Sequence, residues 1–417
     1  MPGYSSIRGS GFAFLLLLWS LWFLIMLVRT ILGPLLPLIE DEFVISHAKA
    51  TSLVMVTSLG ASTSLFASGV FSGRFGYKKS ILLYLAVSMV VFLLIPHARA
   101  FSQIAALFFV FGMVTGAYFP CVIPIVTEHY APSAWGRALA IQDTGASLSV
   151  FAGPLLVSLL AKFLSWRQFF TVFAAAYVTS GVLFLLFSKE VRVESRLRSY
   201  VGGMLKRRSL WVLAVIWTFG TGAFMAVYQV TPLYLTKELS LSIEHANAVL
   251  SLSRLGGVAF GVIMGFLVDR FDLKRSMFMV LCMTGLFTML MGHANITIVQ
   301  VGLFLQGTTI MGFYATGLMA LSRMFSMEER SVAAGVVSTV SGVFGSALVP
   351  YLFGIAGDHI SFRFGMVVFG ALVALASVLV YFLRIPAAVR ERPVQGEWQV
   401  TRLKGSERER ERGQESS

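Results

Sequence analysis

The chain has 417 residues, of which 57% are hydrophobic and only 13% are charged. A soluble domain carries about 25% charged residues, so this composition excludes an ordinary soluble protein and indicates one that lies in lipid. The formal net charge of +13 would favour nucleic acid in a soluble protein, but here the basic residues follow the pattern of membrane loops. We therefore expect membrane lipid as a partner and no nucleic acid.

Apolar stretches long enough to cross a hydrocarbon core of about 30 Å recur along the chain. The first, from Gly11 to Leu38, lacks the cleavage site of a secretory signal, so we expect a retained helix. The predicted spans are 11–38, 50–71, 80–97, 102–126, 138–162, 168–188, 209–234, 245–268, 276–293, 296–322, 331–356 and 364–384. The sequence thus predicts an all-α membrane protein with twelve transmembrane helices.

Polar segments divide these spans into two sets of six. A basic linker at 189–208 separates an N-terminal half, 11–188, from a C-terminal half, 209–384. Residues 1–10 form a short N-terminus, and the mixed-charge tail 385–417 is too polar to fold alone, so we expect it to be disordered. Few basic residues fall on the side opposite the N-terminus: Lys49, Arg99, Lys162, Arg167, Lys237 and Arg363. The positive-inside rule then predicts cytoplasmic termini in a bacterial inner (plasma) membrane.

Distinctive residues recur at one constant offset of 196 positions. The recurring pairs are Gly60 with Gly256, Gly69 with Gly265, Gly116 with Gly312, Tyr118 with Tyr314, Pro154 with Pro350, Ser165 with Ser361, and Arg167 with Arg363. Chance matches would not keep one offset across five helices. We expect two parallel six-helix bundles related by a pseudo-two-fold axis along the membrane normal, with a solute site between them near the midplane.

A loop after the second span carries the most specific motif. It reads SGRFGYKK and is repeated as VDRFDLKR in the second half. The chain resembles the major facilitator superfamily over residues 10 to 385, and this loop resembles the family's Gly-x-x-x-Asp-Arg-x-Gly-Arg-Lys motif. The matching residues are Gly69, Arg74, Gly76, Lys78 and Lys79 in the first copy, and Gly265, Asp269 and Arg270 in the second.

The resemblance implies that these residues form a gate that latches the halves together on the cytoplasmic side. Gly73 stands where the family has an acid in the first copy, and Glu128 or Asp143 are the candidate substitutes. Alternatively, the basic residues only obey the positive-inside rule. The in-register recurrence of the glycine and the Arg-Phe pair favours the gate.

Two arginines, Arg29 and Arg254, lie inside predicted spans, where a charge costs at least about 2.5 kcal/mol. Neither has a repeat partner, because the equivalent positions hold Met225 and Ser58. A guanidinium offers forked donors that suit a carboxylate or a similar oxyanion. These arginines predict an anionic solute, and the alternative is a structural bond to carbonyls or a neighbouring acid.

Neutral side chains in the spans are further candidates for binding the solute. They are Tyr118, Tyr314, Tyr228, Gln229 and Gln142, although a tyrosine in such a helix equally serves packing. Asp143 is the only carboxylate inside a predicted span and is the candidate for proton coupling, unless it pairs with Arg137 near the surface. Counter-anion coupling is the other option.

The sequence favours a secondary active transporter, working as symporter or antiporter, and resembles the organic-anion and monocarboxylate-type members of the superfamily. The alternative is a drug/proton antiporter, because Gly153 and Pro154 are similar to the glycine-proline motif of that group. Cys121 and Cys282 are too few for a metal or disulfide framework, and no catalytic constellation is present. We expect no enzyme activity, no cofactor, no metal and a monomer.

Overall fold

The computed structural model describes residues 7, 9–191, 201–268 and 271–386. The chain divides into two units, 1–384 and 385–417, and the helices belong to the first. Within the described residues the regular structure is helical, without strands. The all-α fold expected from the sequence is confirmed.

The first half contains seven α-helices in chain order. They are α1 (Ser10–Thr30), α2 (Leu32–Phe43), α3 (His47–Phe75), α4 (Tyr77–Leu94), α5 (Phe101–His129), α6 (Trp135–Leu160) and α7 (Trp166–Phe187), with short 3-10 turns η1 (Ile95–His97) and η2 (Pro132–Ala134). Helices α1 and α2 together fill the first predicted span.

The second half repeats this plan with more interruptions. Its helices are α9 (Arg208–Thr221), α10 (Val227–Leu233), α11 (Ile243–Leu252), α12 (Leu255–Val268), α13 (Leu273–Leu290), α14 (Ile296–Met324), α15 (Met327–Ser341), α16 (Val349–His359) and α17 (Phe362–Ala376), and the short helix α8 (Val201–Met204) lies in the predicted linker. Between them lie the π-helical turns η3 (Gly222–Ala226), η4 (Tyr234–Glu238) and η5 (Gly342–Leu348), and a 3-10 turn η6 (Ser377–Phe382) ends the bundle.

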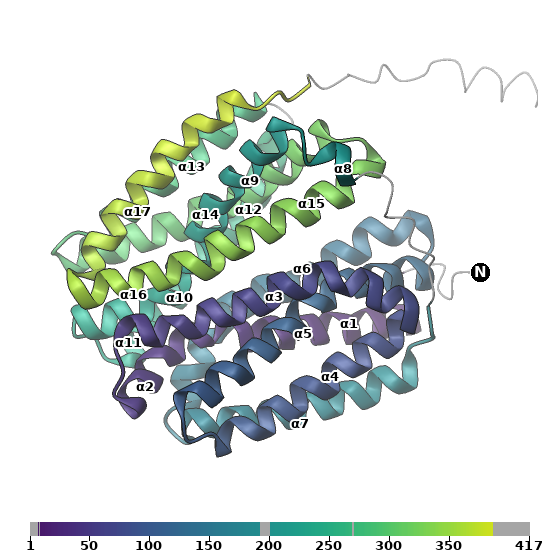
Figure 1. Ribbon diagram of the computed structural model, residues 1–417, viewed down its shortest axis with the longest axis horizontal. Helices are drawn as coiled ribbons and strands as arrows, with labels where there is room; N and C mark the ends of the chain where they lie inside the picture. Colours follow the sequence, from purple (N-terminus) through teal and green to yellow (C-terminus); the bar gives the residue numbers. More distant parts are fainter. Residues whose placement is uncertain (1–6, 8, 192–200, 269–270, 387–417) are drawn as a thin grey trace, which may run out of the picture. The chain divides into compact units, whose positions relative to one another are not determined.

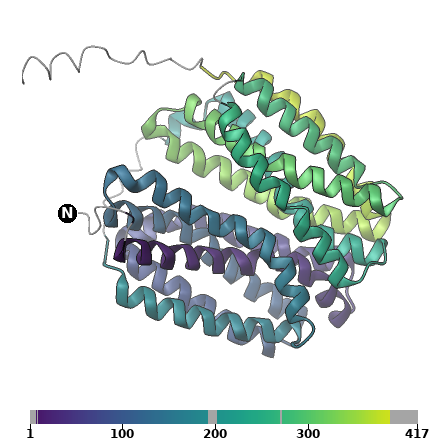
Figure 2. The ribbon, with the colours of Figure 1, turned by 180° about the vertical axis from the view of Figure 1, so that it is seen from behind.

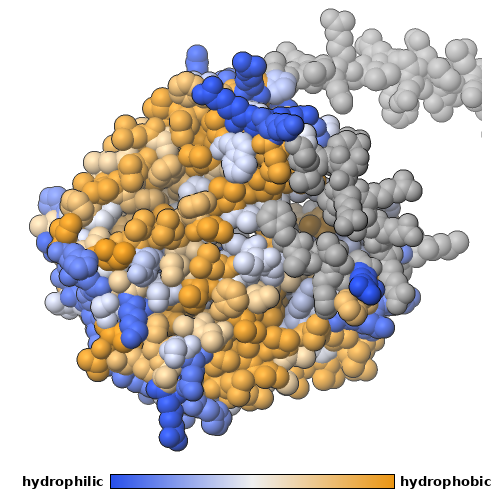
Figure 3. All heavy atoms as spheres, in the orientation of Figure 1, coloured by the Kyte–Doolittle hydropathy of each residue, from blue (hydrophilic) through white to orange (hydrophobic). Residues whose placement is uncertain are grey.

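Ten helices among the described residues are long and apolar enough to cross a membrane. The two remaining predicted spans are occupied by α3 and by α11 with α12. Hydrophobic side chains cover most of the face seen in Figure 3, and hydrophilic ones gather mainly at its margins. The chain is a multi-pass membrane protein.

The repeated glycines lie where helices cross closely. A Cβ atom on Gly60 would lie 2.2 Å from the Phe109 carbonyl oxygen, and one on Gly116 would lie 2.0 Å from that of Ala61. In the second half, a Cβ on Gly256 would lie 2.2 Å from the Thr308 hydroxyl. Small residues let membrane helices pack backbone to backbone, so these glycines explain the contacts of α3 with α5 and of α12 with α14.

The two halves form separate bundles that lie side by side (Figures 1 and 2), and α3 contacts the π-helical turn η5 of the second half. Helix α2 contacts α10, α3 contacts α16, and α6 contacts α11. We call the face that carries the connections near residues 45, 98, 163, 240, 293 and 360 the predicted external face, and the opposite one the predicted cytoplasmic face.

Candidate solute site and gates

Arg254 lies at the break between α11 and α12, where residues 253–254 form a turn. Its side chain is 4% exposed, and none of its three guanidinium nitrogens has a hydrogen-bond partner among the described residues. The guanidinium carbon lies 5.1 Å from the centre of the Tyr228 ring, and a Cβ on Gly307 would lie 3.3 Å from Nη1. The guanidinium is thus enclosed between α10 and α14, with the Tyr228 ring face beside it and without a hydrogen-bond acceptor among the described residues.

Arg29 lies in the last turn of α1 and is partly exposed. Its guanidinium interacts electrostatically with the hydroxyl of Tyr314, which comes from α14 of the other half. Tyr314 also interacts with Asp143 of α6, whose carboxyl is close to the Trp22 indole. Tyr314 of the second half is therefore within electrostatic range of both Arg29 and Asp143 of the first half.

Two further candidates connect the halves directly. The Tyr228 hydroxyl donates to the Val150 carbonyl over 3.1 Å, and the Gln229 amide donates to the Arg29 carbonyl over 2.9 Å. The Gln229 carbonyl oxygen is buried without a described hydrogen-bond partner. Both residues are 3% exposed or less.

Gln142 and Tyr118 lie within the first half. Both polar atoms of the Gln142 side chain are buried without described hydrogen-bond partners. The Tyr118 hydroxyl approaches the Leu18 carbonyl at 3.5 Å, and its ring stacks on Trp22 with the centroids 5.6 Å apart. The structure places Tyr118 in the packing between α1 and α5.

A polar cluster joins the halves at the predicted external face. The Asp358 carboxylate, at the end of α16, accepts hydrogen bonds from the backbone amides of His47 (2.8 Å) and Ala48 (2.9 Å) at the start of α3. Lys237 of η4 pairs with Asp41 and, at 3.6 Å, with Glu40. We call Glu40, Asp41, Lys237 and Asp358, with the start of α3, the external latch. No motif or repeat in the sequence predicts this latch.

A second polar arrangement at this face occurs once in each half. Arg167 pairs with Glu42 over 2.7 Å, and Arg363 pairs with Glu238 over 3.3 Å. Glu238 follows Glu42 at the same offset of 196 residues that relates the two arginines. The repeat therefore carries a signal for these pairs, because the acid and the arginine both recur at one offset.

The predicted cytoplasmic gate is only partly described. Asp269 and Arg270 lie outside the described residues, and Gly69 and Gly265 are described only as helical backbone. Lys78 donates to the carbonyls of Leu185 (2.8 Å) and Ser188, Gly76 has a φ of 94°, and Arg74 and Lys79 are exposed.

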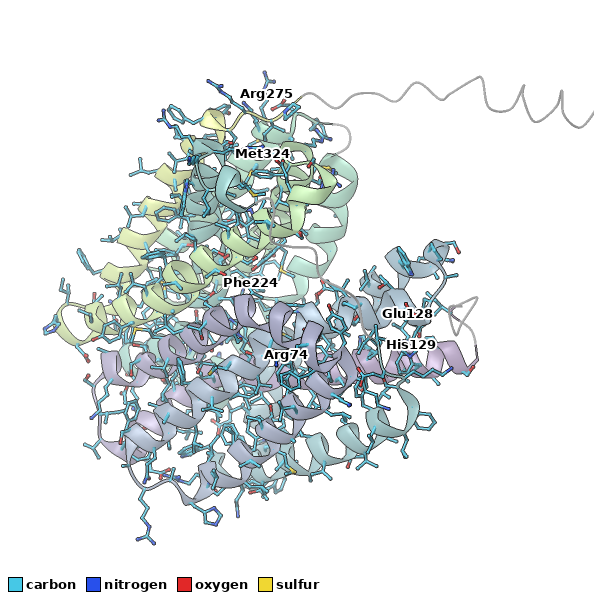
Figure 4. All side chains as sticks on the ribbon, turned by 45° about the vertical axis from the view of Figure 1, so that its right-hand side comes forward. Arg74, Glu128, His129, Phe224, Arg275 and Met324 are labelled. Atoms are coloured by element: carbon cyan, nitrogen blue, oxygen red, sulfur yellow. The ribbon has the colours of Figure 1, made fainter. Side chains whose placement is uncertain are left out.

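In Figure 4, Arg74 and Glu128 lie on one bundle, and Met324 and Arg275 lie on the other. Among the described residues, the hydrogen bonds between the halves run from the level of Arg29 and Val150 to the predicted external face. The halves are therefore joined on that side in this conformation.

Comparison with known proteins identifies the family. The sequence model of the Major Facilitator Superfamily matches residues 18–257 and 229–408. The chain is 23% identical over 385 residues to a hexuronate transporter of Bacillus subtilis, and the alignment covers 84% of this chain and 89% of that protein. It is 24% identical to the human sodium-dependent phosphate transport protein 1, and that alignment covers 80% of this chain and 79% of the human protein. A probable nitrate/nitrite transporter, NarK2, of Mycobacterium tuberculosis is 24% identical, and the alignment covers 58% of this chain and 62% of that protein.

Solved structures share the fold at low sequence identity. A D-xylose-proton symporter aligns with a TM-score of 0.76 at 14% identity, covering 91% of this chain and 98% of that one. A bacterial homologue of the human lysosomal transporter Spinster, in an inward-facing and unoccupied conformation, aligns with a TM-score of 0.73 at 13% identity, covering 88% and 96%. The sequence match, the repeat and the two bundles agree: this chain belongs to the major facilitator superfamily.

Proposed function

We propose that this protein is a secondary active transporter that moves a small anion, a carboxylate or a similar oxyanion, by alternating access. The observation that carries the proposal is the enclosed Arg254 guanidinium, which has no described hydrogen-bond acceptor. An ion buried without a partner costs several kcal/mol. A solute that supplies a pair of oxygen acceptors would recover this energy and match the fork of the guanidinium.

Arg29 supports the same solute class from the other half of the molecule. It is partly exposed, whereas Arg254 is enclosed, so of these two arginines Arg29 is the one that an entering anion would meet first. An anion held between one arginine from each half would stabilise an arrangement in which the halves approach each other. That differential binding is what alternating access requires of a solute.

The names of the relatives agree with an anion. Hexuronate, phosphate and nitrate all carry oxygen atoms with negative charge, and transporters named for them are 23% to 24% identical to this chain. With cytoplasmic termini, as the positive-inside rule predicts, the conformation joined at the external latch is the inward-facing one. We assign Asp143, with Tyr314 beside it, as the candidate group for proton coupling.

The test is uptake into vesicles that contain the purified protein. Labelled hexuronate, a monocarboxylate, a dicarboxylate, phosphate and nitrate are compared for the wild type, Arg254→Gln and Arg29→Gln. Arg384→Gln is the matched control, because it removes an exposed arginine at the end of the bundle. We expect at least one anion to be taken up, a loss of at least tenfold in both site variants, and no change in the control.

Two results would overturn the proposal. One is transport of cationic dyes with no transport of any anion, which would favour the drug/proton antiporter. The other is normal anion uptake by Arg254→Gln. Asp143→Asn separates the coupling assignment from the solute assignment, because it should abolish uptake driven by a pH gradient while leaving exchange of the anion across the membrane intact.

A further inference from the structure

Helix α6 contains a carbonyl group that its own backbone does not satisfy. Pro154 lies inside this helix and has no amide hydrogen, so the carbonyl of Val150, four residues earlier, lacks its helical donor. Inside a bilayer such a group needs a partner from elsewhere in the protein. The partner is the Tyr228 hydroxyl of α10, which donates to it over 3.1 Å in a buried position.

Gly153 lies next to this contact. A Cβ on Gly153 would lie 3.5 Å from the Tyr228 hydroxyl and 3.0 Å from that of Thr30. The proline frees the acceptor, while Gly153 lies beside the donor, where a side chain larger than that of alanine would crowd both hydroxyls. The neighbouring carbonyl of Phe151 accepts from Ser251 of α11, which strengthens the contact between α6 and the second half.

The repeat makes this arrangement informative. Pro350 is equivalent to Pro154, but it follows the π-helical turn η5 (Gly342–Leu348). A π-helical turn reassigns helical hydrogen bonds locally, which is one way for a membrane helix to accommodate a proline. Helix α6 is α-helical from Trp135 to Leu160, so its free carbonyl is left for the other half to satisfy.

Tyr228 also touches the candidate solute site. Its ring lies 5.1 Å from the Arg254 guanidinium carbon, while its hydroxyl reaches the first half. One rigid side chain therefore contacts both the enclosed cation and the interface between the halves. We propose that Tyr228 is the positioning residue that couples the Arg254 site to the closed arrangement of the halves, through the carbonyl that Pro154 leaves free.

The inference rests on the proposed function for the role of Arg254, but its conformational part does not depend on which solute is carried. When the halves separate at the predicted external face, the hydrogen bond between Tyr228 and Val150 is lost. A single buried hydrogen bond corresponds to a change of about three- to tenfold in such an equilibrium. Tyr228→Phe keeps the ring against Arg254 and removes the hydroxyl, and with it the bond to Val150 and the contact with Thr30 of the same half.

The experiment measures the distance between spin labels on the two halves, in the full chain, in vesicles and without solute. Phe163→Cys and Ala294→Cys carry the labels, because both positions are exposed at the predicted external face, and Cys121 and Cys282 are replaced by alanine. We expect Tyr228→Phe to raise the ratio of the long-distance to the short-distance population by about three- to tenfold. Tyr234→Phe is the matched control, because its hydroxyl donates to the Met291 carbonyl within the second half.

A double-mutant cycle with Pro154→Ala tests the origin of the bond. The substituted alanine would supply the missing amide, so in the Pro154→Ala background Tyr228→Phe should change the ratio by less than about twofold. Gly153→Val is a second perturbation, which should displace the hydroxyl and reproduce the effect of Tyr228→Phe.

The proposal fails if Tyr228→Phe leaves the ratio unchanged, or if Tyr234→Phe changes it equally. It also fails if the effect of Tyr228→Phe is the same with the native Pro154 and in the Pro154→Ala background. Failure of the anion assay alone would reject the solute class and leave this distance measurement valid.

Discussion

Replacing Asp358 by alanine should open the predicted external face. Its carboxylate accepts from the first two amides of α3, at His47 and Ala48, while Ser46 accepts from Lys49. Asp358 therefore caps a helix of the other half, an arrangement that exists only while the halves are together. Loss of a capping side chain costs about 1 kcal/mol, and the helix dipole adds about 0.3 kcal/mol at an exposed site. The sum corresponds to about an eightfold change in the equilibrium between the conformations in which the predicted external face is closed and open.

The assay is the distance between labels at positions 163 and 294. Asp358→Ala should increase the long-distance population about eightfold, and Asp358→Asn should have a smaller effect because its side-chain oxygen still accepts one bond. Glu244→Gln is the control, since this exposed acid lies in the first turn of α11. An unchanged distance distribution in Asp358→Ala, with the protein folded, would refute the assignment of Asp358 as part of the latch.

Three further predictions concern the latch and the repeated scaffold. Lys237→Met should shift the label distances in the same direction by less than about fivefold, and the shift should shrink at high salt, because Asp41 is 64% exposed and such pairs are weak. Gly116→Val should prevent folding, because a Cβ there would lie 2.0 Å from the Ala61 carbonyl oxygen. Gly136→Val should be tolerated, because nothing lies within 4 Å of a Cβ at that position. The yield of monodisperse protein after detergent extraction measures both effects. Arg167→Gln should lower the thermal unfolding midpoint more than Arg99→Gln, because Arg167 also donates to the carbonyls of Ile95 and Ala98; equal midpoints would contradict this.

The membrane fold could be predicted because its causes are local and periodic. Apolar length predicts a span, and the offset of 196 residues predicts two related halves without reference to any contact. The structure gives the repeated residues physical roles: Ser165 and Ser361 each accept a backbone hydrogen bond at the start of a helix, and Gly60 and Gly116 lie at close crossings. The constant offset in the sequence is enough to single out these residues, but their roles can be assigned only from the contacts in the structure.

The external latch could not be predicted in this way. Asp358 bonds to His47, 311 residues away, and such a contact leaves no periodic signal in one sequence. The π-helical turns in the second half could not be predicted either, because one extra residue in a helical turn does not change the apolar pattern of a span enough to be detected.

Residues that are repeated in both halves differ in role from residues that occur in one half alone. Residues that build the scaffold occur twice, as Glu42 with Arg167 and Glu238 with Arg363 show. Several residues that meet across the interface occur once: Asp358 is replaced by Lys162 at the equivalent position, and Tyr228 by Leu32, whereas Tyr314 is repeated as Tyr118. A contact between two related halves joins different faces of the repeated unit, so duplicating a residue does not duplicate the contact. Residues without a repeat partner are therefore the ones to examine for solute binding and gating, and Arg254 and Tyr228 are both of this kind.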